Sequence, residues 1–234
     1  MRIATTLIAA AVMTAGSVSA QSNKYVEVHS PPTGEASHSE ILGRALGGTF
    51  NGSGARDFTN GSIFADRMKD KRSSNTDRYW DAGTYHVEVI AREAAYTHEI
   101  GTVEGRRGNT DSFLSLVNTA DIGSQASVTM DSDFRWAIDV NSGGQSRWND
   151  HLYTSRQWDN SDGVDHMVSY ELYNDGGKLF GYALFFEDLW YGGDCDYNDA
   201  AVLLTLVPTP QAAMLGLTGL GGLGLMTGRR RRSM

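Results

Sequence analysis

Short apolar runs with a period of two dominate this chain, and they predict β-strands rather than helices. In residues 85–91 (YHVEVIA) most apolar side chains occupy alternate positions, while His86 and Glu88 face the other way. That alternation is typical of a strand with one buried face. Similar runs predict strands at residues 25–29, 96–103, 126–130, 134–140, 164–173, 179–186 and 200–207.

Turn signals separate these runs, such as NSGG at 141–144 and NDGG at 174–177. The second predicts a tight hairpin, because Asn, Asp and Gly adopt positive φ at little cost. About eight or nine strands predict an all-β domain, an antiparallel β-sandwich of Ig-like or jelly-roll type. Residues 112–118 fit either a helical turn or a strand, and residues 30–80, rich in Gly, Ser, Asn and Arg, predict long loops.

The N-terminal residues have the pattern of a secretory signal peptide. Arg2 is followed by the apolar run 7–12, and Val18-Ser19-Ala20 provides the small-residue cleavage signal. We therefore expect residues 1–20 to be removed during export, which leaves Gln21 as the first residue of the mature chain.

The C-terminal residues predict a membrane segment. Val207-Pro208-Thr209-Pro210 precedes the uncharged stretch 211–228, and four arginines, Arg229 to Arg232, follow it. About 18 helical residues span roughly 27 Å, enough for a thin hydrocarbon core. The positive-inside rule would keep the arginines in the cytoplasm and place residues 21–207 outside. An ordinary single-span anchor is one interpretation of residues 208–234.

A second interpretation rests on resemblance. The order V-P-T-P, a Gly- and Leu-rich span and an Arg cluster resembles the PEP-CTERM sorting signal of bacteria that make extracellular polysaccharide, although Thr209 stands where that family has Glu. The resemblance implies an exosortase-like processing enzyme as a partner. It also implies a cell-surface, outer-membrane or extracellular-matrix location and an association with exopolysaccharide.

The charge balance narrows the classes of partner. All 28 acidic residues lie within residues 21–207, which hold 15 of the 20 basic ones, so this part carries a net charge of −13. An acidic surface argues against nucleic-acid binding, and it is compatible with divalent cations as well as with simple solubility. Because Cys195 is the single cysteine, no intramolecular disulfide can form.

The densest chemistry lies between the last two predicted strands. Five carboxylates and an amide crowd a Gly-containing stretch: Glu187, Asp188, Asp194, Asp196, Asn198 and Asp199. Such crowding is repulsive unless a cation lies among the oxygens, and Ca²⁺ takes six to eight oxygen ligands. We therefore predict a Ca²⁺ site formed by these six residues. The alternative is an acidic hairpin whose side chains cap backbone N–H groups as Asx-turns.

Neighbouring residues in this stretch give more specific expectations. Because Glu187 and Asp188 are adjacent, one of them should face the site and the other solvent if they lie on a strand. Trp190, Tyr191 and Tyr197 are expected to pack around the loop. An EF-hand is excluded, since Asp199 replaces its glycine and a strand follows in place of a helix.

The same stretch carries a second resemblance. Residues 186–202, with F-E-D-L, glycines and D-x-D-Y-N-D, resemble the end of the bacterial domain-of-unknown-function family 4114, and residues 163–168 resemble the strand that precedes it. Members of that family are extracellular and often occur in adhesins. The resemblance implies metal binding without implying catalysis.

A further acidic run, residues 159–166, lies before the predicted hairpin. Asp162 or Asp165 could supply another ligand to the site, or the run could be an exposed turn. His166 is expected to be a hydrogen-bonded core residue, because Ca²⁺ prefers oxygen.

Together these patterns predict a non-enzymatic exported surface or matrix protein with a structural Ca²⁺ site. A carbohydrate-binding module is the alternative, and a polysaccharide-cleaving enzyme using two carboxylates is a further one. Neither a nucleophile elbow nor an H-E-x-x-H motif occurs in the sequence.

Overall fold

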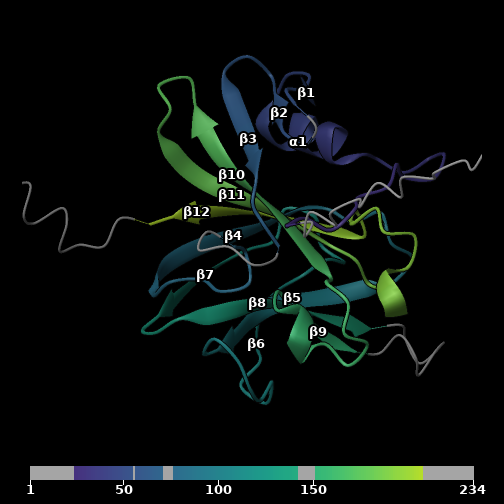
Figure 1. Ribbon diagram of the computed structural model, residues 1–234. Helices are drawn as coiled ribbons and strands as arrows, with labels where there is room; N and C mark the ends of the chain where they lie inside the picture. The colour runs from purple at the N-terminus through teal and green to yellow at the C-terminus, as the bar shows by residue number, and fades with distance from the viewer. Residues whose placement is uncertain (1–23, 55, 71–75, 142–150, 208–234) are drawn as a thin grey trace, which may run out of the picture.

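The computed structural model describes residues 24–54, 56–70, 76–141 and 151–207. Two antiparallel sheets make up most of it (Figure 1). The larger sheet has the order β1-β2-β3-β10-β11-β12-β4-β7. Its strands are β1 (Asn51–Gly52), β2 (Phe58–Thr59), β3 (Ile63–Arg67), β4 (Gly83–Ala91), β7 (Gln125–Met130), β10 (Met167–Asn174), β11 (Leu179–Phe186) and β12 (Ala200–Leu206).

The smaller sheet has the order β6-β5-β8-β9. Its strands are β5 (Thr97–Glu104), β6 (Leu114–Asn118), β8 (Phe134–Asn141) and β9 (Leu152–Thr154). Two short 3₁₀ segments, η1 (Gln157–Asp159) and η2 (Trp190–Gly192), lie in connecting loops. The expected all-β class and antiparallel pairing are confirmed, and the choice between an Ig-like and a jelly-roll topology stays a prediction.

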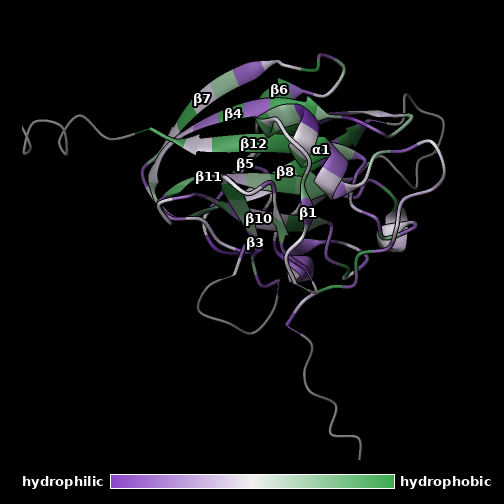
Figure 2. Ribbon diagram, turned by 90° about the horizontal axis from the view of Figure 1, so that it is seen from above, coloured by the Kyte–Doolittle hydropathy of each residue, from purple (hydrophilic) through white to green (hydrophobic). Residues whose placement is uncertain are grey.

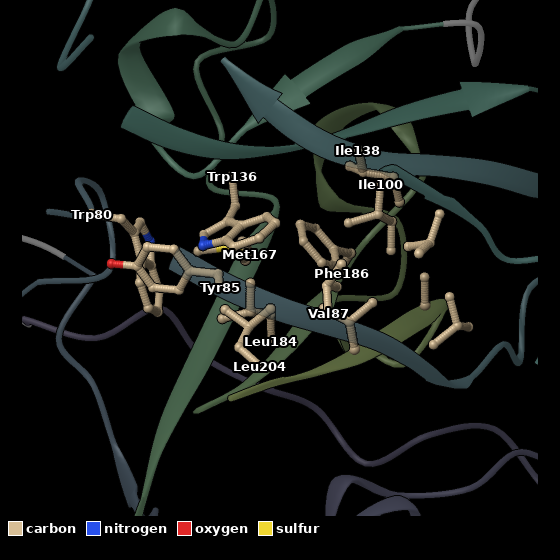
Figure 3. Close-up of a cluster of buried hydrophobic side chains, with 14 of the residues drawn as sticks. Trp80, Tyr85, Val87, Ile100, Trp136, Ile138, Met167, Leu184, Phe186 and Leu204 are labelled. Atoms are coloured by element: carbon tan, nitrogen blue, oxygen red, sulfur yellow. The ribbon is translucent and has the colours of Figure 1, made fainter. Parts of the chain in front are cut away.

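The first hydrophobic core fills the space between the two sheets. Figure 3 shows Val87 and Leu204 from the larger sheet facing Ile100 and Ile138 from the smaller one. Aromatic rings close one end of this core: Trp80 meets Trp136 edge to face, with 6.3 Å between ring centroids. Edge-to-face pairs of this kind add to the stabilisation that burial provides.

A second core lies on the opposite face of the larger sheet. There α1 (His38–Leu46) places Ile41 and Leu42 against side chains such as Val168 and Phe185. Strands β11 and β12 are therefore covered on both faces. This explains why their sequences are nearly continuous apolar runs, which Figure 2 shows as green ribbon along β12.

The helix α1 was not predicted from the sequence, because residues 30–80 were expected to form loops. This segment also contains strands β1, β2 and β3. The signal for the helix is present in the sequence: Ser37 caps Glu40 N–H, and the Glu40 carboxylate accepts a hydrogen bond from the Ser37 N–H at 2.7 Å. That reciprocal arrangement is a capping box, S-x-x-E.

Three further expectations can be compared with the strands. The NDGG hairpin is confirmed, with Tyr173 opposite Leu179 across the turn. Residues 114–118 form a strand, which decides the choice left open between helix and strand. The strand expected at 25–29 is absent, and this segment runs instead as extended chain beside the loop that follows β11.

No helix among the described residues is long and apolar enough to cross a membrane. The predicted signal peptide (1–20) and the predicted sorting segment (208–234) lie outside the described residues.

Candidate metal centre

The loop that joins β11 to β12, residues 187–199, holds all six predicted ligands, and we call it the acidic loop. Phe186 and Ala200 are paired across the two strands, so the loop begins and ends at the same end of this strand pair. The Glu187 N–H donates to His166 O at 3.0 Å and extends the pairing with the chain before β10. The apolar strands thus fix both ends of a polar loop.

The backbone of the acidic loop is strained. Tyr191, Cys195 and Tyr197 have φ of 61°, 63° and 56°, and they are the non-glycine residues with positive φ in the described part of the chain. Left-handed conformations of this kind cost roughly 1–2 kcal/mol per residue and persist where the surroundings over-determine them. A loop held in this way presents its side chains in one fixed arrangement.

Three carboxylates, two buried and one half-buried, form a group that we call the inner cluster: Glu187, Asp188 and Asp199. One carboxylate oxygen from each lies within 4.8 Å of those from the other two. Glu187 and Asp188 are 0% and 2% exposed. The expectation that one of these two faces solvent is wrong, because both residues follow the end of β11 and are free of the alternation of a strand.

Hydrogen bonds satisfy only part of the inner cluster. The Asp188 N–H donates to Asp199 Oδ2 at 2.8 Å, and the Leu189 N–H donates weakly to Glu187 Oε1 at 3.4 Å. Glu187 Oε2 and Asp188 Oδ2 are buried and have no hydrogen-bond partner among the described residues. His98 Nε2 from β5 lies 3.2 Å from Asp188 Oδ2, but the geometry is not that of a hydrogen bond.

Burial and mutual repulsion act in the same direction on these carboxyl groups. Burial, reinforced by the charge of Asp199, raises the pKa of Glu187 to about 10. Burial and the charge of Asp188 raise the pKa of Asp199 to about 8, against the opposing effect of the Asp188 N–H. Without a cation these groups therefore hold protons at neutral pH, whereas a bound cation would take the place of the protons.

A second group of oxygens lies at the other end of the loop, and we call it the outer cluster: Glu35, Asp194 and Asp196. Their ligand atoms also lie within 4.8 Å of one another. Asp194 is exposed and Asp196 is buried. Asn198 joins this group, since its Nδ2 donates to Glu35 Oε2 at 3.4 Å and to Ala36 O at 3.1 Å.

The Asx-turn considered as an alternative is present at Asp196, whose Oδ1 accepts the Asn198 N–H at 3.2 Å. It accounts for only one oxygen of the group. Asp196 Oδ2 and Asn198 Oδ1 are buried and have no hydrogen-bond partner among the described residues. Burial raises the pKa of Asp196 to about 6, with Asp194 and Glu35 adding repulsion and the Asn198 N–H opposing it.

The six predicted ligands are thus divided between two groups, with Glu187, Asp188 and Asp199 in one and Asp194, Asp196 and Asn198 in the other. Either group could hold a metal ion. Glu35 was not predicted, because it lies about 160 positions before the loop and no spacing pattern connects the two. Only the packing of the N-terminal segment against the loop brings it there.

In the neighbouring acidic run, residues 159–166, the Asp162 carboxylate is engaged in hydrogen bonds. Asp162 Oδ2 lies 2.8 Å from His166 Nε2 and accepts the Tyr191 N–H at 2.9 Å. Burial tends to raise the pKa of Asp162, but the hydrogen bond and charge of His166, together with the N–H groups of Val164 and Tyr191, outweigh it and lower the pKa. His166 is buried and stacked on Tyr153 with 3.6 Å between ring centroids, which confirms it as a hydrogen-bonded core residue.

The aromatic residues of the acidic loop differ in their environment. Tyr197 is buried, and its hydroxyl donates a hydrogen bond to Asp165 O at 3.0 Å, so it packs within the loop as expected. Trp190 is half-buried against His151, with 4.7 Å between ring centroids. Tyr191 is 69% exposed, so the expectation that it packs around the loop is wrong.

Comparison with known proteins does not assign the chain to a family. No protein-family model and no curated protein matches the chain. The resemblance of residues 186–202 to the domain-of-unknown-function family 4114 therefore stays a prediction drawn from the motif.

The pKa values of the inner cluster predict how stability changes with pH. A carboxyl group whose pKa is raised on folding stabilises the fold below its unfolded pKa, and this contribution is lost as pH rises through the folded pKa. The loss of this contribution extends from about pH 4.5 to about pH 10 for Glu187 and from about pH 3.8 to about pH 8 for Asp199. In the presence of chelator, the temperature of the unfolding midpoint should therefore decrease as the pH is raised from about 5 to about 9. The Glu187→Gln variant should show a flatter profile; a midpoint that rises with pH would contradict this assignment.

Gly193 gives a steric test of the inner cluster. A Cβ at Gly193 would lie 2.4 Å from Glu187 Oε1 and 2.9 Å from Leu189 Cβ, so Gly193→Ala should displace the Glu187 carboxylate. Gly177 has a similar positive φ, but a Cβ there would have no atom within 4 Å, so Gly177→Ala is the matched control. We expect Gly193→Ala to reduce metal affinity at least tenfold, measured by calorimetric titration, and Gly177→Ala to leave it unchanged. Equal affinity in both variants would exclude Glu187 as a ligand.

Proposed function

We propose that the protein is an exported, non-enzymatic cell-surface or extracellular-matrix protein in which Ca²⁺ bound by the acidic loop stabilises the fold. The observation that carries the proposal is the pair of buried carboxylate oxygens, Glu187 Oε2 and Asp188 Oδ2, which have no hydrogen-bond partner among the described residues. An unpaired buried acceptor costs roughly 1–3 kcal/mol, and more if it is charged. A bound cation removes that cost.

The donor set favours Ca²⁺ over other metals. Carboxylate and amide oxygens are hard ligands, which suit Ca²⁺ and Mg²⁺, whereas Zn²⁺ and copper sites use His nitrogen or Cys sulfur. Ca²⁺ tolerates irregular geometry, but Mg²⁺ demands a near-ideal octahedron. The two carboxylate clusters, built around an irregular, strained loop, therefore fit Ca²⁺ better than Mg²⁺.

Burial supports a structural rather than a catalytic role. Two carboxylates at short separation are the machinery of glycoside hydrolases, which is why an enzyme was considered. Glu187 is 0% exposed, Asp188 is 2% exposed, and Gly193 and Leu189 lie over the Glu187 carboxylate. A polysaccharide would have no access to these groups, while a small ion would.

Residues outside the described part of the chain support the location. The signal peptide pattern of residues 1–20 and the apolar, Arg-terminated segment 208–234 indicate export followed by membrane retention or exosortase-type processing. A net charge of −13 for residues 21–207 suits a soluble extracellular domain. The association with exopolysaccharide and adhesion follows from the resemblances alone.

Thermal unfolding of the purified full chain tests the calcium site. At a hundredfold excess over Kd, Ca²⁺ should add about 2.7 kcal/mol to the free energy of unfolding. For a domain of this size that is a rise of roughly 5–10 °C in Tm relative to chelator. Glu187→Gln should remove most of the rise, and Glu104→Gln, at an exposed position, should retain it. A Tm that is the same with Ca²⁺ and with chelator would refute the proposal.

Cell fractionation tests the location. In a bacterial host, mass spectrometry of the exported protein should find Gln21 at its N-terminus. The full chain should be recovered with the membrane or cell surface, and a chain ending at residue 207 should be released in soluble form. Recovery of both chains in the cytoplasm with residues 1–20 intact would contradict export.

A further inference from the structure

The outer face of the larger sheet carries a cavity of about 540 Å³. Its walls are the extended segment 26–31, residues 37–39 at the start of α1, and side chains from β2, β3 and β10. This volume is within the range of small-molecule sites. The cavity is separate in its lining from the inner cluster, but Asp196 of the outer cluster forms part of its wall.

Two guanidinium groups, Arg56 and Arg67, line this cavity in a chain that is otherwise strongly acidic. Arg67 is 5% exposed, and its Nη2 is held by Asp70 at 3.1 and 3.2 Å. Its Nε is buried and has no hydrogen-bond partner among the described residues. Arg56 is exposed and stacks over the Tyr25 ring at 4.4 Å. Planar guanidinium groups of this kind recognise carboxylates.

The other lining groups suit a polyhydroxylated molecule rather than an apolar one. The half-buried Phe58 ring lies 5.6 Å from the buried Tyr170 ring, measured between centroids, and Ser30 and Ser39 are also part of the lining. Aromatic faces pack against the C–H faces of such molecules, while hydroxyls and guanidinium groups hydrogen-bond to their polar edges.

His38 contributes a neutral floor. Its Nε2 lies 3.2 Å from the Tyr197 carbonyl, which can only accept, so Nε2 carries the proton and Nδ1 accepts from the Tyr170 hydroxyl at 2.9 Å. Burial, assisted by the charge of Arg67, lowers the pKa of His38 to about 3. His38 therefore adds no positive charge to the cavity, whose lining includes the guanidinium groups of Arg56 and of Arg67, the latter paired with Asp70.

The cavity walls are attached to the outer cluster. The His29 N–H donates to Cys195 O at 2.9 Å, and His29 Nδ1 lies 2.8 Å from the Asp194 carbonyl. On the other wall, Asn198 Nδ2 donates to Ala36 O. A cation bound by Glu35, Asp194 and Asp196 would hold both walls in place. It would also neutralise the carboxylate of Asp196, which otherwise repels an anion in the cavity.

We infer that this cavity binds a small sugar acid, a polyhydroxylated carboxylate, through Arg56 and Arg67, and that the binding depends on a cation in the outer cluster. The cation dependence rests on the proposed calcium function, whereas the anion site rests on the cavity itself. Glu27 at the exposed rim opposes the anion and limits the affinity.

Calorimetric titration of the full chain with D-glucuronate in Ca²⁺ tests the inference, with D-glucose and acetate as the neutral and ring-free counterparts. Glucuronate should bind at least tenfold more tightly than either. Arg56→Gln should weaken glucuronate binding about tenfold without changing the calcium-dependent rise in Tm, because Arg56 is exposed and outside both clusters. Arg107→Gln, another exposed arginine, is the matched control and should have no effect.

The remaining outcomes separate the two proposals. If Ca²⁺ raises the Tm but glucuronate does not bind, or binds no better than glucose or acetate, the cavity inference is overturned and the calcium function stands. If the Arg56→Gln and Arg107→Gln variants bind glucuronate equally well, the anion site is overturned. If Glu35→Gln or chelator leaves glucuronate binding unchanged, the cation dependence is overturned.

Discussion

Electrostatic repulsion among the carboxylates of the acidic loop is the constraint on which the rest of this structure depends. Two apolar strands, β11 and β12, fix the ends of the loop, which leaves its first acidic residues, Glu187 and Asp188, buried and its last, Asp199, half-buried. The apolar packing gained by the strands therefore requires either protons or a cation between Glu187, Asp188 and Asp199. This links the stability of the core to the chemistry of the surrounding medium.

The position of the loop explains how one short segment can influence several parts of the molecule. Its inner cluster lies beside His98 of the smaller sheet, and its outer cluster contacts the segment that leads into α1. The loop therefore touches both cores, the one between the sheets and the one under the helix. A cation at either cluster would connect layers that the apolar cores alone hold only by nondirectional packing.

The division of the acidic loop into two clusters also separates two kinds of role. The inner cluster is buried beneath Gly193 and Leu189, so it is suited to holding an ion for stability. The outer cluster adjoins a cavity with two arginines, so an ion there would lie near any molecule that the cavity takes up. The two clusters differ chiefly in burial.

The sequence by itself determined the all-β class, most strands of the larger sheet, β5 and β8 of the smaller one, the hairpin at 174–177 and the acidic loop. Alternation, turn residues and local charge density are properties of neighbouring positions. The sequence also contains the capping box of α1, S-x-x-E at residues 37–40. Only the tertiary structure decided that Glu187 and Asp188 are both buried, that the six ligands form two groups, and that Glu35 completes one of them. The physical reason is that ion sites and cavities form between segments far apart in the chain, and no local pattern records which segments pack together.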